Sequence, residues 1–311
     1  MRIALVDPSR TTRLIVARML EAGGHEVAPF GDERDALARI KADPTIEALI
    51  TSAELTHMSG VELCWETRLV ATCRRPIYVV MMSSQYDQRS LIEALDSGAD
   101  DFIGKPPLAE ELYARLRAAE RIASMQRELL RLATTDPLTG LCNRRGFFER
   151  ATEACARVVP PDGSVSAIIL DIDNFKQIND SYGHEAGDEA IRACARAARV
   201  QEAVTGRLGG DEFALLLERK SLPQAIEVAE DLRVRLAQRP IDTGKGPITL
   251  TWSLGVGEGR PGDTIDQILA RADVALYDAK LKGRNCVVGN SAIVPARNAV
   301  ATEGIVRALA M

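Results

Sequence analysis

Two adjacent carboxylates, Asp211 and Glu212, follow a pair of glycines between two apolar runs of the chain. This pattern predicts a β-hairpin over residues 206–217, because glycine adopts turn angles that other residues avoid. Side chains alternate along a strand, so we expect the two carboxylates to point to opposite sides and to have different roles. Taken alone, however, the pattern is more typical of an ordinary hairpin with a solvated acidic turn.

A third carboxylate and two cations suggest what the hairpin could help to bind. Asp171 follows a predicted buried strand, and a strand end is a rigid place for a ligand of a divalent cation, which Asp211 could complete. Lys280 and Arg284 lie four residues apart at the predicted end of a helix, so both can face one polyphosphate. Each residue alone could be a strand end or a surface charge, but together they predict a site for magnesium and a nucleotide.

The elements that would position these residues form an α+β domain over residues 136–290. The mixture favours a mostly antiparallel central sheet. Strands are predicted at 167–170, in the hairpin, at 248–255 and at 286–288, and helices at 144–157, 175–182, 188–198, about 223–238 and about 264–283.

Five motifs of this domain resemble the GGDEF family of diguanylate cyclases. They are Asp136–Arg145, Asp171–Asp180, Tyr182–Asp188, Gly209–Phe213 and Ala279–Asn285. Five motifs in the same order over about 150 residues leave little room for coincidence. The resemblance implies an enzyme that condenses two GTP molecules into cyclic di-GMP and two pyrophosphates where two subunits face each other.

The resemblance also implies roles for matching positions. The metal, Mg²⁺ or alternatively Mn²⁺, would be held by the side chains of Asp171 and Asp211 and by the backbone carbonyl of Ile172. Asp211 or Glu212 would accept the proton of the attacking 3′-hydroxyl, and the sequence does not decide between them. The substrate-binding positions are Lys176, Lys280 and Arg284 for phosphate, with Arg207 as an addition, and Asn179 and Asp188 for guanine. His184 lies beside the guanine residues, where it could either brace the loop or touch the substrate.

Residues 1–107 alternate between short strands and helices. This alternation predicts an α/β domain with a doubly wound, parallel five-stranded sheet. The strands are expected at 3–6, 27–30, 48–51, 78–82 and 101–103, and the helices at 11–21, 33–41, 61–69 and 88–97. In such sheets the functional crevice lies at the carboxyl ends of the strands, and the residues there are Asp7, Pro8, Ser52, Ser83 and Lys105.

Three segments of this domain, Leu5–Arg10, Met58–Gly60 and Gly98–Pro106, resemble the receiver domain of bacterial response regulators. In that family, a strand-end aspartate accepts a phosphoryl group beside a magnesium ion that two acidic residues hold after the first strand. A hydroxyl-bearing switch residue and a lysine complete the family site.

The crevice departs from the family at two of its positions. Ser52 stands at the acceptor position, and Pro8 replaces the acidic partner of Asp7, whereas Ser83 and Lys105 match the switch residue and the lysine. A neutral hydroxyl is a weaker nucleophile than a carboxylate at pH 7, and the loss of two carboxylates weakens a magnesium site. We therefore predict a degenerate receiver that is not phosphorylated, with Asp7 and Lys105 as an ion pair, acting as a scaffold or binding a regulatory protein.

Residues 108–135 are predicted to form a helical connector, since residues 108–132 contain no glycine or proline. Its apolar residues recur at spacings of four and three, at Ala118, Ile122, Met125, Leu129 and Leu132. This seam favours a dimeric coiled coil, with a single amphipathic helix packed on its own domain as the alternative. Residues 291–311 carry no motif, and either a disordered tail or a short docking helix fits them.

Composition narrows the class of protein. The 311 residues carry a net charge of −5 and no dense basic block, which argues against nucleic acid as the main ligand. The longest apolar runs are too short to span a membrane, and scattered cysteines with no secretory signal favour the cytoplasm. Besides an active diguanylate cyclase, the alternatives are a non-catalytic regulator that binds GTP or cyclic di-GMP and, with less support, a cyclase that uses ATP.

Overall fold

The structure, a computed structural model, describes residues 1–72, 74–85, 88–158 and 164–290. The chain divides into two compact units, Met1–Leu130 and Arg131–Met311. The alternatives for residues 291–311 lie outside the described residues.

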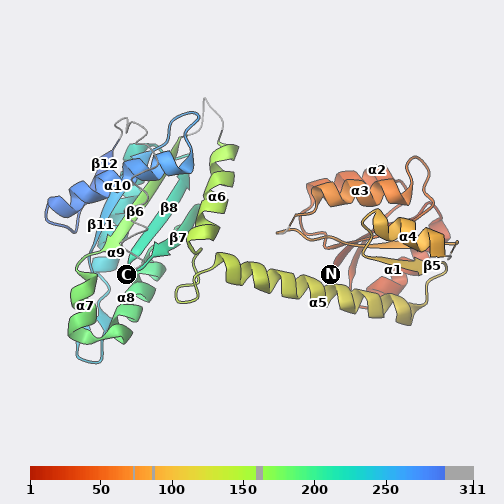
Figure 1. The fold of residues 1–311 in the computed structure, drawn as a ribbon, viewed down its shortest axis with the longest axis horizontal. Helices are drawn as coiled ribbons and strands as arrows, with labels where there is room; N and C mark the ends of the chain where they lie inside the picture. The colour runs from red at the N-terminus through yellow and green to blue at the C-terminus, as the bar shows by residue number, and fades with distance from the viewer. Residues whose placement is uncertain (73, 86–87, 159–163, 291–311) are drawn as a thin grey trace. The chain divides into compact units, whose positions relative to one another are not determined.

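The first unit contains a parallel five-stranded sheet in the order β2-β1-β3-β4-β5 (Figure 1). Alternate side chains of β1 point to opposite faces of this sheet, so Ile3 and Leu5 join one core and Ala4 and Val6 join the other. The strands are β1 (Arg2–Val6), β2 (Glu26–Phe30), β3 (Ala48–Ser52), β4 (Tyr78–Ser83) and β5 (Asp101–Gly104). The predicted α/β fold is confirmed.

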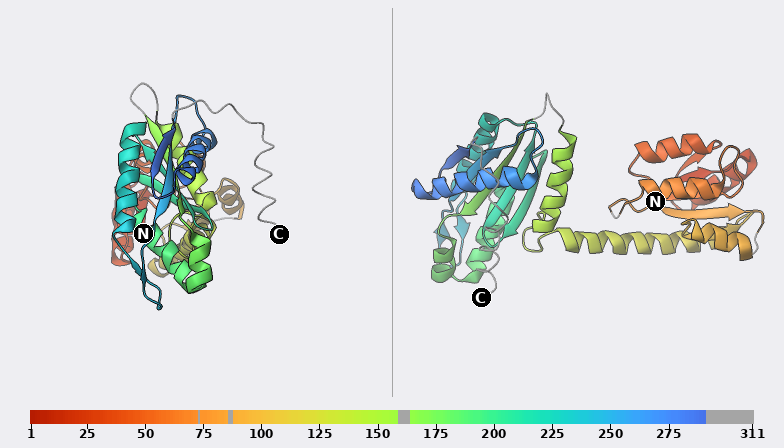
Figure 2. Two further views of the ribbon diagram at one scale, coloured as in Figure 1. Left: turned by 90° about the vertical axis from the view of Figure 1, so that its left-hand side faces the viewer. Right: turned by 45° about the horizontal axis from the view of Figure 1, so that its top comes forward.

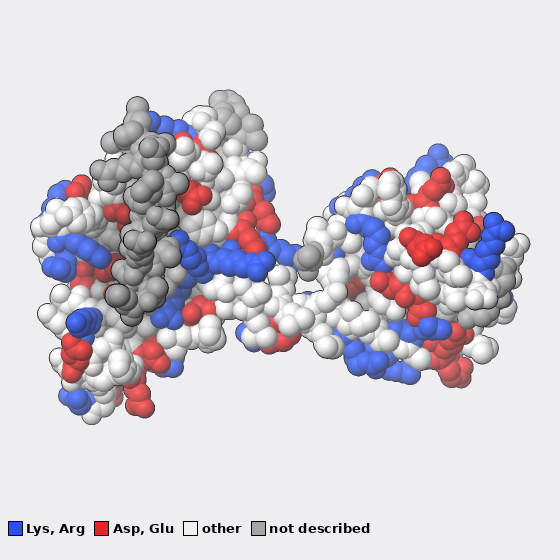
Figure 3. Space-filling model, in the orientation of Figure 1, with Lys and Arg blue, Asp and Glu red and all other residues white. Residues whose placement is uncertain are grey.

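Helices cover both faces of this sheet. The core on one face includes residues of α2 (Glu33–Ala42), α3 (Gly60–Val70) and α4 (Gln88–Asp96). The core on the other face includes residues of α1 (Arg10–Ala22) and of the first turns of α5 (Ala109–Thr134). On the face drawn in Figure 3, acidic and basic side chains are interspersed over this unit.

The predicted connector is one continuous helix, α5, of 26 residues. Its first turns bury Leu112, Leu116 and Ala119 within the first unit. Four of the five predicted seam residues, Ile122, Met125, Leu129 and Leu132, are instead between 48% and 66% exposed, and Ala118 is half-buried. The exposed side chains argue against the alternative in which the seam packs on its own domain.

The second unit contains a five-stranded sheet in the order β12-β11-β6-β8-β7. Three of its four strand pairs are antiparallel, and only β11 and β12 run parallel. The strands are β6 (Val165–Ile172), β7 (Ala203–Gly209), β8 (Glu212–Glu218), β11 (Trp252–Glu258) and β12 (Val287–Asn290). The predicted α+β domain with a mostly antiparallel sheet is thus confirmed.

Helices also cover both faces of the second sheet (Figures 1 and 2). The core on one face includes residues of α6 (Arg144–Arg157) and α10 (Ile265–Leu281), and the core on the other includes residues of α8 (His184–Ala197) and α9 (Leu222–Ala237). Helix α7 (Phe175–Tyr182) precedes α8, and a small hairpin of β9 (Ile241–Asp242) and β10 (Pro247–Ile248) follows α9.

Two elements of this domain begin four residues away from their predicted start. The strand expected from residue 248 begins at Trp252, because Ile248 belongs to the small hairpin instead. The helix expected from residue 188 begins at His184, because Gly183 alone, with a φ of 88°, separates α7 from α8. Gly187, which was predicted to lie in this break, is a buried residue of α8.

Candidate active site

The predicted hairpin is formed by β7 and β8, with Gly209 opposite Glu212 and a loop of Gly210 and Asp211. Gly210 has a φ of 50°, which is the conformation that favours glycine at this position. Asp211 lies in the loop, so strand alternation does not fix the direction of its side chain. Glu212 is the first residue of β8, and its side-chain direction follows the sheet.

Asp171 and Glu212 lie directly opposite each other on the neighbouring strands β6 and β8. Paired residues of adjacent strands point to the same face of a sheet, so these two carboxylates share one side. Burial and the negative charge of Asp211 raise the pKa of Asp171, although Lys280 partly offsets this. Loss of surrounding water and the charge of Asp171 likewise raise the pKa of Glu212. Like charges held together in this way are a favourable place for a cation.

Lys280 supplies positive charge at this site. Its Nζ lies 2.8 Å from Oδ2 of Asp171, and it is carried by the last turn of α10. The prediction that Lys280 and Arg284 lie one helical turn apart is wrong. Helix α10 ends at Leu281, and Arg284 follows it in a turn with a φ of 66°. The guanidinium of Arg284 is therefore carried by a loop, and the side chain of Arg284 is exposed.

The predicted guanine-binding residues come from two consecutive helices. Asn179 is on α7, and His184 and Asp188 are on α8. Asn179 lies against α8 so closely that a Cβ on Gly187 would come within 2.0 Å of its Oδ1. The structure thus brings Asn179 next to the residue that precedes Asp188. His184, Asp188 and Lys176 on α7 are exposed.

The Arg207 side chain contacts the loop of the hairpin. Its guanidinium pairs with Asp136 at 3.1 Å and donates two hydrogen bonds to the carbonyl of Gly210, at 2.9 and 2.7 Å. These contacts favour support of the loop beside Asp211. Phosphate binding by Arg207 stays a prediction.

The donors around Asp171 fit magnesium. Within the described residues, no three His, Cys, Asp or Glu side chains are grouped to hold a metal ion. Magnesium normally requires only one or two carboxylates when it also binds substrate phosphates. Asp171 and Glu212 supply such a pair, Asp211 is in the adjoining loop, and Ile172 adds a backbone carbonyl at the end of β6. Sequence reasoning placed Asp211 in the metal site but did not reveal that Glu212 is the residue across from Asp171.

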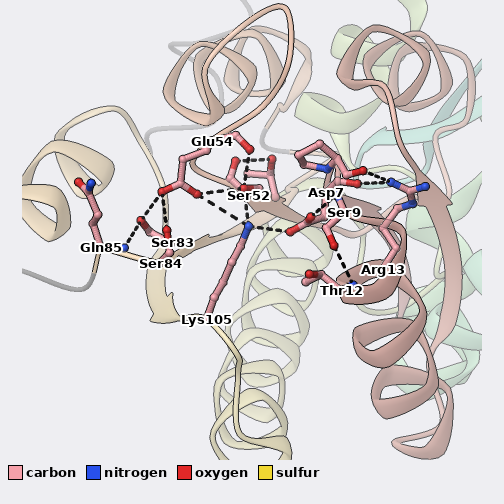
Figure 4. A network of polar contacts seen from close by, with 12 residues as sticks. Asp7, Ser9, Thr12, Arg13, Ser52, Glu54, Ser83, Ser84, Gln85 and Lys105 are labelled. Atoms are coloured by element: carbon pink, nitrogen blue, oxygen red, sulfur yellow. Dashed lines mark hydrogen bonds and ion pairs between the residues drawn. The ribbon is translucent and has the colours of Figure 1, made fainter.

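A polar network joins the predicted crevice residues of the first unit (Figure 4). Lys105 Nζ lies 2.7 Å from Oδ2 of the buried Asp7 and donates to Ser52 Oγ at 2.5 Å. The predicted ion pair between Asp7 and Lys105 is confirmed. Ser52 is fully buried and donates in turn to the backbone carbonyl of Glu54 at 2.7 Å. Pro8 follows Asp7, and its carbonyl accepts a hydrogen bond from Arg13.

Sequence reasoning missed Glu54, which completes this network. Its Oε1 accepts hydrogen bonds from Ser83 and Ser84, both at 3.1 Å, and its Oε2 lies 3.9 Å from Lys105 Nζ. A carboxylate two residues beyond Ser52 was the only available signal. Glu54 places a negative charge between the ends of β3 and β4, although Ser52 itself is neutral.

Comparison with known protein families gives a separate match for each of the two compact units. Residues 133–286 match the family described as the diguanylate cyclase GGDEF domain, and residues 3–117 match the response regulator receiver domain. No described helix is long and apolar enough to cross a membrane.

Individual relatives extend the comparison. The response regulator PleD of Caulobacter vibrioides is 32% identical over 94% of this chain and 66% of its own length. A diguanylate cyclase of Vibrio cholerae is 40% identical over 53% of this chain and 52% of its own length. The chain therefore spans less than two thirds of these relatives.

A solved structure that contains a coiled coil and a GGDEF domain also matches this chain. The coiled coil and GGDEF domain of DgcB from Caulobacter crescentus, in complex with c-di-GMP, is 33% identical with a TM-score of 0.53. The match covers 58% of this chain and 97% of that structure. By these matches, the chain joins a response regulator receiver domain to a domain of the diguanylate cyclase GGDEF family.

Proposed function

We propose that the chain is a diguanylate cyclase that converts two GTP molecules into cyclic di-GMP and two pyrophosphates. The observation that carries this proposal is the pair of facing carboxylates, Asp171 and Glu212, with Lys280 beside them. An ordinary acidic hairpin would not place a second carboxylate and a cation at the same sheet position. The match of residues 133–286 to the family supports the same activity.

The reaction requires each 3′-hydroxyl to attack the α-phosphorus of the GTP on the other subunit. The new O–P bond forms as the bond to the β-phosphate oxygen breaks, and pyrophosphate leaves. Asp211 or Glu212 accepts the hydroxyl proton. Magnesium, held by Asp171, the Ile172 carbonyl and Asp211 or Glu212, would supply positive charge to the phosphate oxygens and lower the pKa of the hydroxyl.

The remaining site residues hold the nucleotide in this proposal. Lys176, Lys280 and Arg284 bind phosphates. The carboxylate of Asp188 accepts from the N1 and N2 hydrogens of guanine, a donor pair that adenine lacks, and Asn179 contributes beside it. His184 adjoins this wall from the start of α8.

A homodimer would provide the two facing GTP molecules. The exposed apolar side chains of Ile122, Met125, Leu129 and Leu132 follow the spacing of a coiled-coil seam, and they lie just before the catalytic domain. The coiled coil named in the DgcB structure supports the same arrangement. We therefore propose that α5 pairs with α5 of a second copy.

A direct assay tests the proposal. Purified protein is incubated with GTP and magnesium, and cyclic di-GMP and pyrophosphate are measured over a range of protein concentrations. We expect one cyclic di-GMP for two pyrophosphates, with a rate per subunit that rises as the dimer forms. ATP in place of GTP should give no cyclic dinucleotide. Binding of GTP without turnover would instead support the non-catalytic regulator, which the altered receiver crevice favours.

We further propose that the receiver domain is not phosphorylated. Ser52 Oγ accepts from the positively charged Lys105 and donates its hydrogen to the Glu54 backbone carbonyl at 2.7 Å, with the nearest carboxylate oxygen, Glu54 Oε2, farther away at 3.4 Å. The hydroxyl hydrogen is therefore held mainly by a carbonyl, which is not a base that could activate Ser52. Ser83, the switch position, already donates a hydrogen bond to the negatively charged carboxylate of Glu54. The domain would then act as a scaffold or contact a regulatory protein.

A small phosphodonor tests this second proposal. With radiolabelled acetyl phosphate and magnesium, we expect no label above background on the intact chain. A variant with Pro8→Asp and Ser52→Asp, which restores both missing carboxylates, serves as the control for detection. Label on the unaltered chain that Ser52→Ala removes would refute the proposal.

A further inference from the structure

The turn that carries Arg284 has an unusual backbone. Gly283, Arg284 and Asn285 follow one another with φ values of 104°, 66° and 46°. Only the first is a glycine, and residues with side chains rarely adopt this region unless surrounding contacts hold them there. The position of Arg284 must therefore be set by neighbouring groups.

One of these groups is the carboxylate of Asp173. Its Oδ2 accepts a hydrogen bond from the backbone N–H of Asn285 at 3.0 Å and another from Thr251 Oγ1 at 2.8 Å. Its Oδ1 accepts from Ser253 Oγ at 2.7 Å. The side chain is only 6% exposed. Both oxygens are thus occupied by protein donors, so Asp173 is not free to bind a metal, although it lies only two residues after Asp171.

The end of β6 and the end of α10 are consequently joined twice. Asp171 contacts Lys280 through the ion pair in the candidate site, and Asp173 contacts the turn that follows through Asn285. The buried Asp173 side chain accepts from three neutral donors, and one of these, the Asn285 N–H, belongs to the turn. It fixes the turn with respect to the strand end that carries the metal-binding carboxylate. The turn has two further attachments, from the Arg284 N–H to the Ala279 carbonyl and from Arg233 to the Asn285 side chain.

We propose that Asp173 is a positioning residue for the triphosphate of GTP: it holds the Gly283–Asn285 turn so that Arg284 reaches the phosphates of a nucleotide bound at Asp171. This inference rests on the proposed function. Asp173 acts through Arg284 and touches neither the metal nor the substrate. Its removal should affect phosphate recognition and leave guanine recognition intact.

Asp173→Asn tests the inference with little change in shape. An amide offers only one acceptor oxygen, so its NH₂ group must face either Ser253 or the pair formed by Thr251 and Asn285. We expect the KM for GTP to rise roughly tenfold with a smaller change in kcat, as for other groups that orient a binding residue. Affinity for 3′-deoxy-GTP, which cannot react, should fall by a similar factor, and affinity for GMP should change much less.

Two further variants sharpen the result. Ser253→Ala removes a donor from Oδ1 only and leaves the Asn285 contact, so it should have a smaller effect on the KM. In the presence of Arg284→Ala, Asp173→Asn should add little, because the two residues act in one chain of contacts. If Asp173→Asn does not fold, as judged by thermal unfolding, Thr251→Val removes the other donor to Oδ2 and keeps the Asn285 contact, so it should raise the KM for GTP by less than tenfold.

Each outcome separates the inference from the proposed function. Equal losses of affinity for 3′-deoxy-GTP and GMP, or effects of Asp173→Asn and Arg284→Ala that simply add, would overturn the role of Asp173. Unchanged affinity in a folded Asp173→Ala protein, which leaves no acceptor for the Asn285 N–H, would do the same. If the unaltered protein binds no guanine nucleotide at all, the proposed function fails first, and the role of Asp173 fails with it.

Discussion

Replacing Glu212 with glutamine is expected to lower the rate of cyclic di-GMP formation by at least about a thousandfold. The substitution keeps the size of the side chain and removes the charge opposite Asp171. Whether this carboxylate binds magnesium or accepts the hydroxyl proton, its charge is needed as the reaction proceeds. Stability should not fall, because the change also removes the repulsion between Glu212 and Asp171.

The measurement is initial rate with GTP and magnesium, with circular dichroism and thermal unfolding as checks of the fold. Glu218→Gln is the matched control, since Glu218 ends the same strand, pairs with Arg157 at 2.6 Å and lies outside the site. It should retain nearly full activity, because such a surface pair contributes little. Asp211→Asn in the same assay compares the two carboxylates. Near-normal rates in both Glu212→Gln and Asp211→Asn would contradict the assignment.

Sequence alone predicted the elements of this site well because their signals are local. The strand that carries Asp171 near its end and the hairpin around Gly210 follow from apolar runs and turn glycines. The register between strands is not local. Only the pairing of β6 with β8 reveals that Glu212, and not Asp211, is the residue directly across from Asp171.

The residues that sequence reasoning missed act through distant contacts. Asp173 accepts hydrogen bonds from residues 78, 80 and 112 positions away, and Glu54 reaches Ser83 over 29 positions. Contacts between residues so far apart in the chain leave no recognisable pattern in the sequence. The backbone conformation of Arg284 could not be predicted either. Gly283 indicates that a helix ends, but it does not indicate that Arg284 and Asn285 also have positive φ values.

The apolar seam of α5 gives the second large effect. Leu129→Glu is expected to weaken the dimer by on the order of 100-fold or more, because two copies of a leucine lose their burial and two negative charges meet. Activity per subunit should fall in parallel at low protein concentration and recover in part at high concentration. The helix itself should persist, since glutamate is a good helix former and Leu129 is 65% exposed within one chain.

Ser124→Glu separates the seam from a general effect of charge. Ser124 is exposed on the same helix, lies off the seam, and uses its hydroxyl only for a bond to the Arg121 carbonyl. The association state of both variants is measured by sedimentation and their rate by the cyclase assay. The two measurements together show whether association and activity change in parallel. A monomeric Leu129→Glu protein with full activity would show that α5 is not what brings two GTP molecules together. A Leu129→Glu protein that remains dimeric would place the contact between subunits elsewhere. Loss of both properties in Leu129→Glu, with neither lost in Ser124→Glu, would make the seam the element that completes the active site.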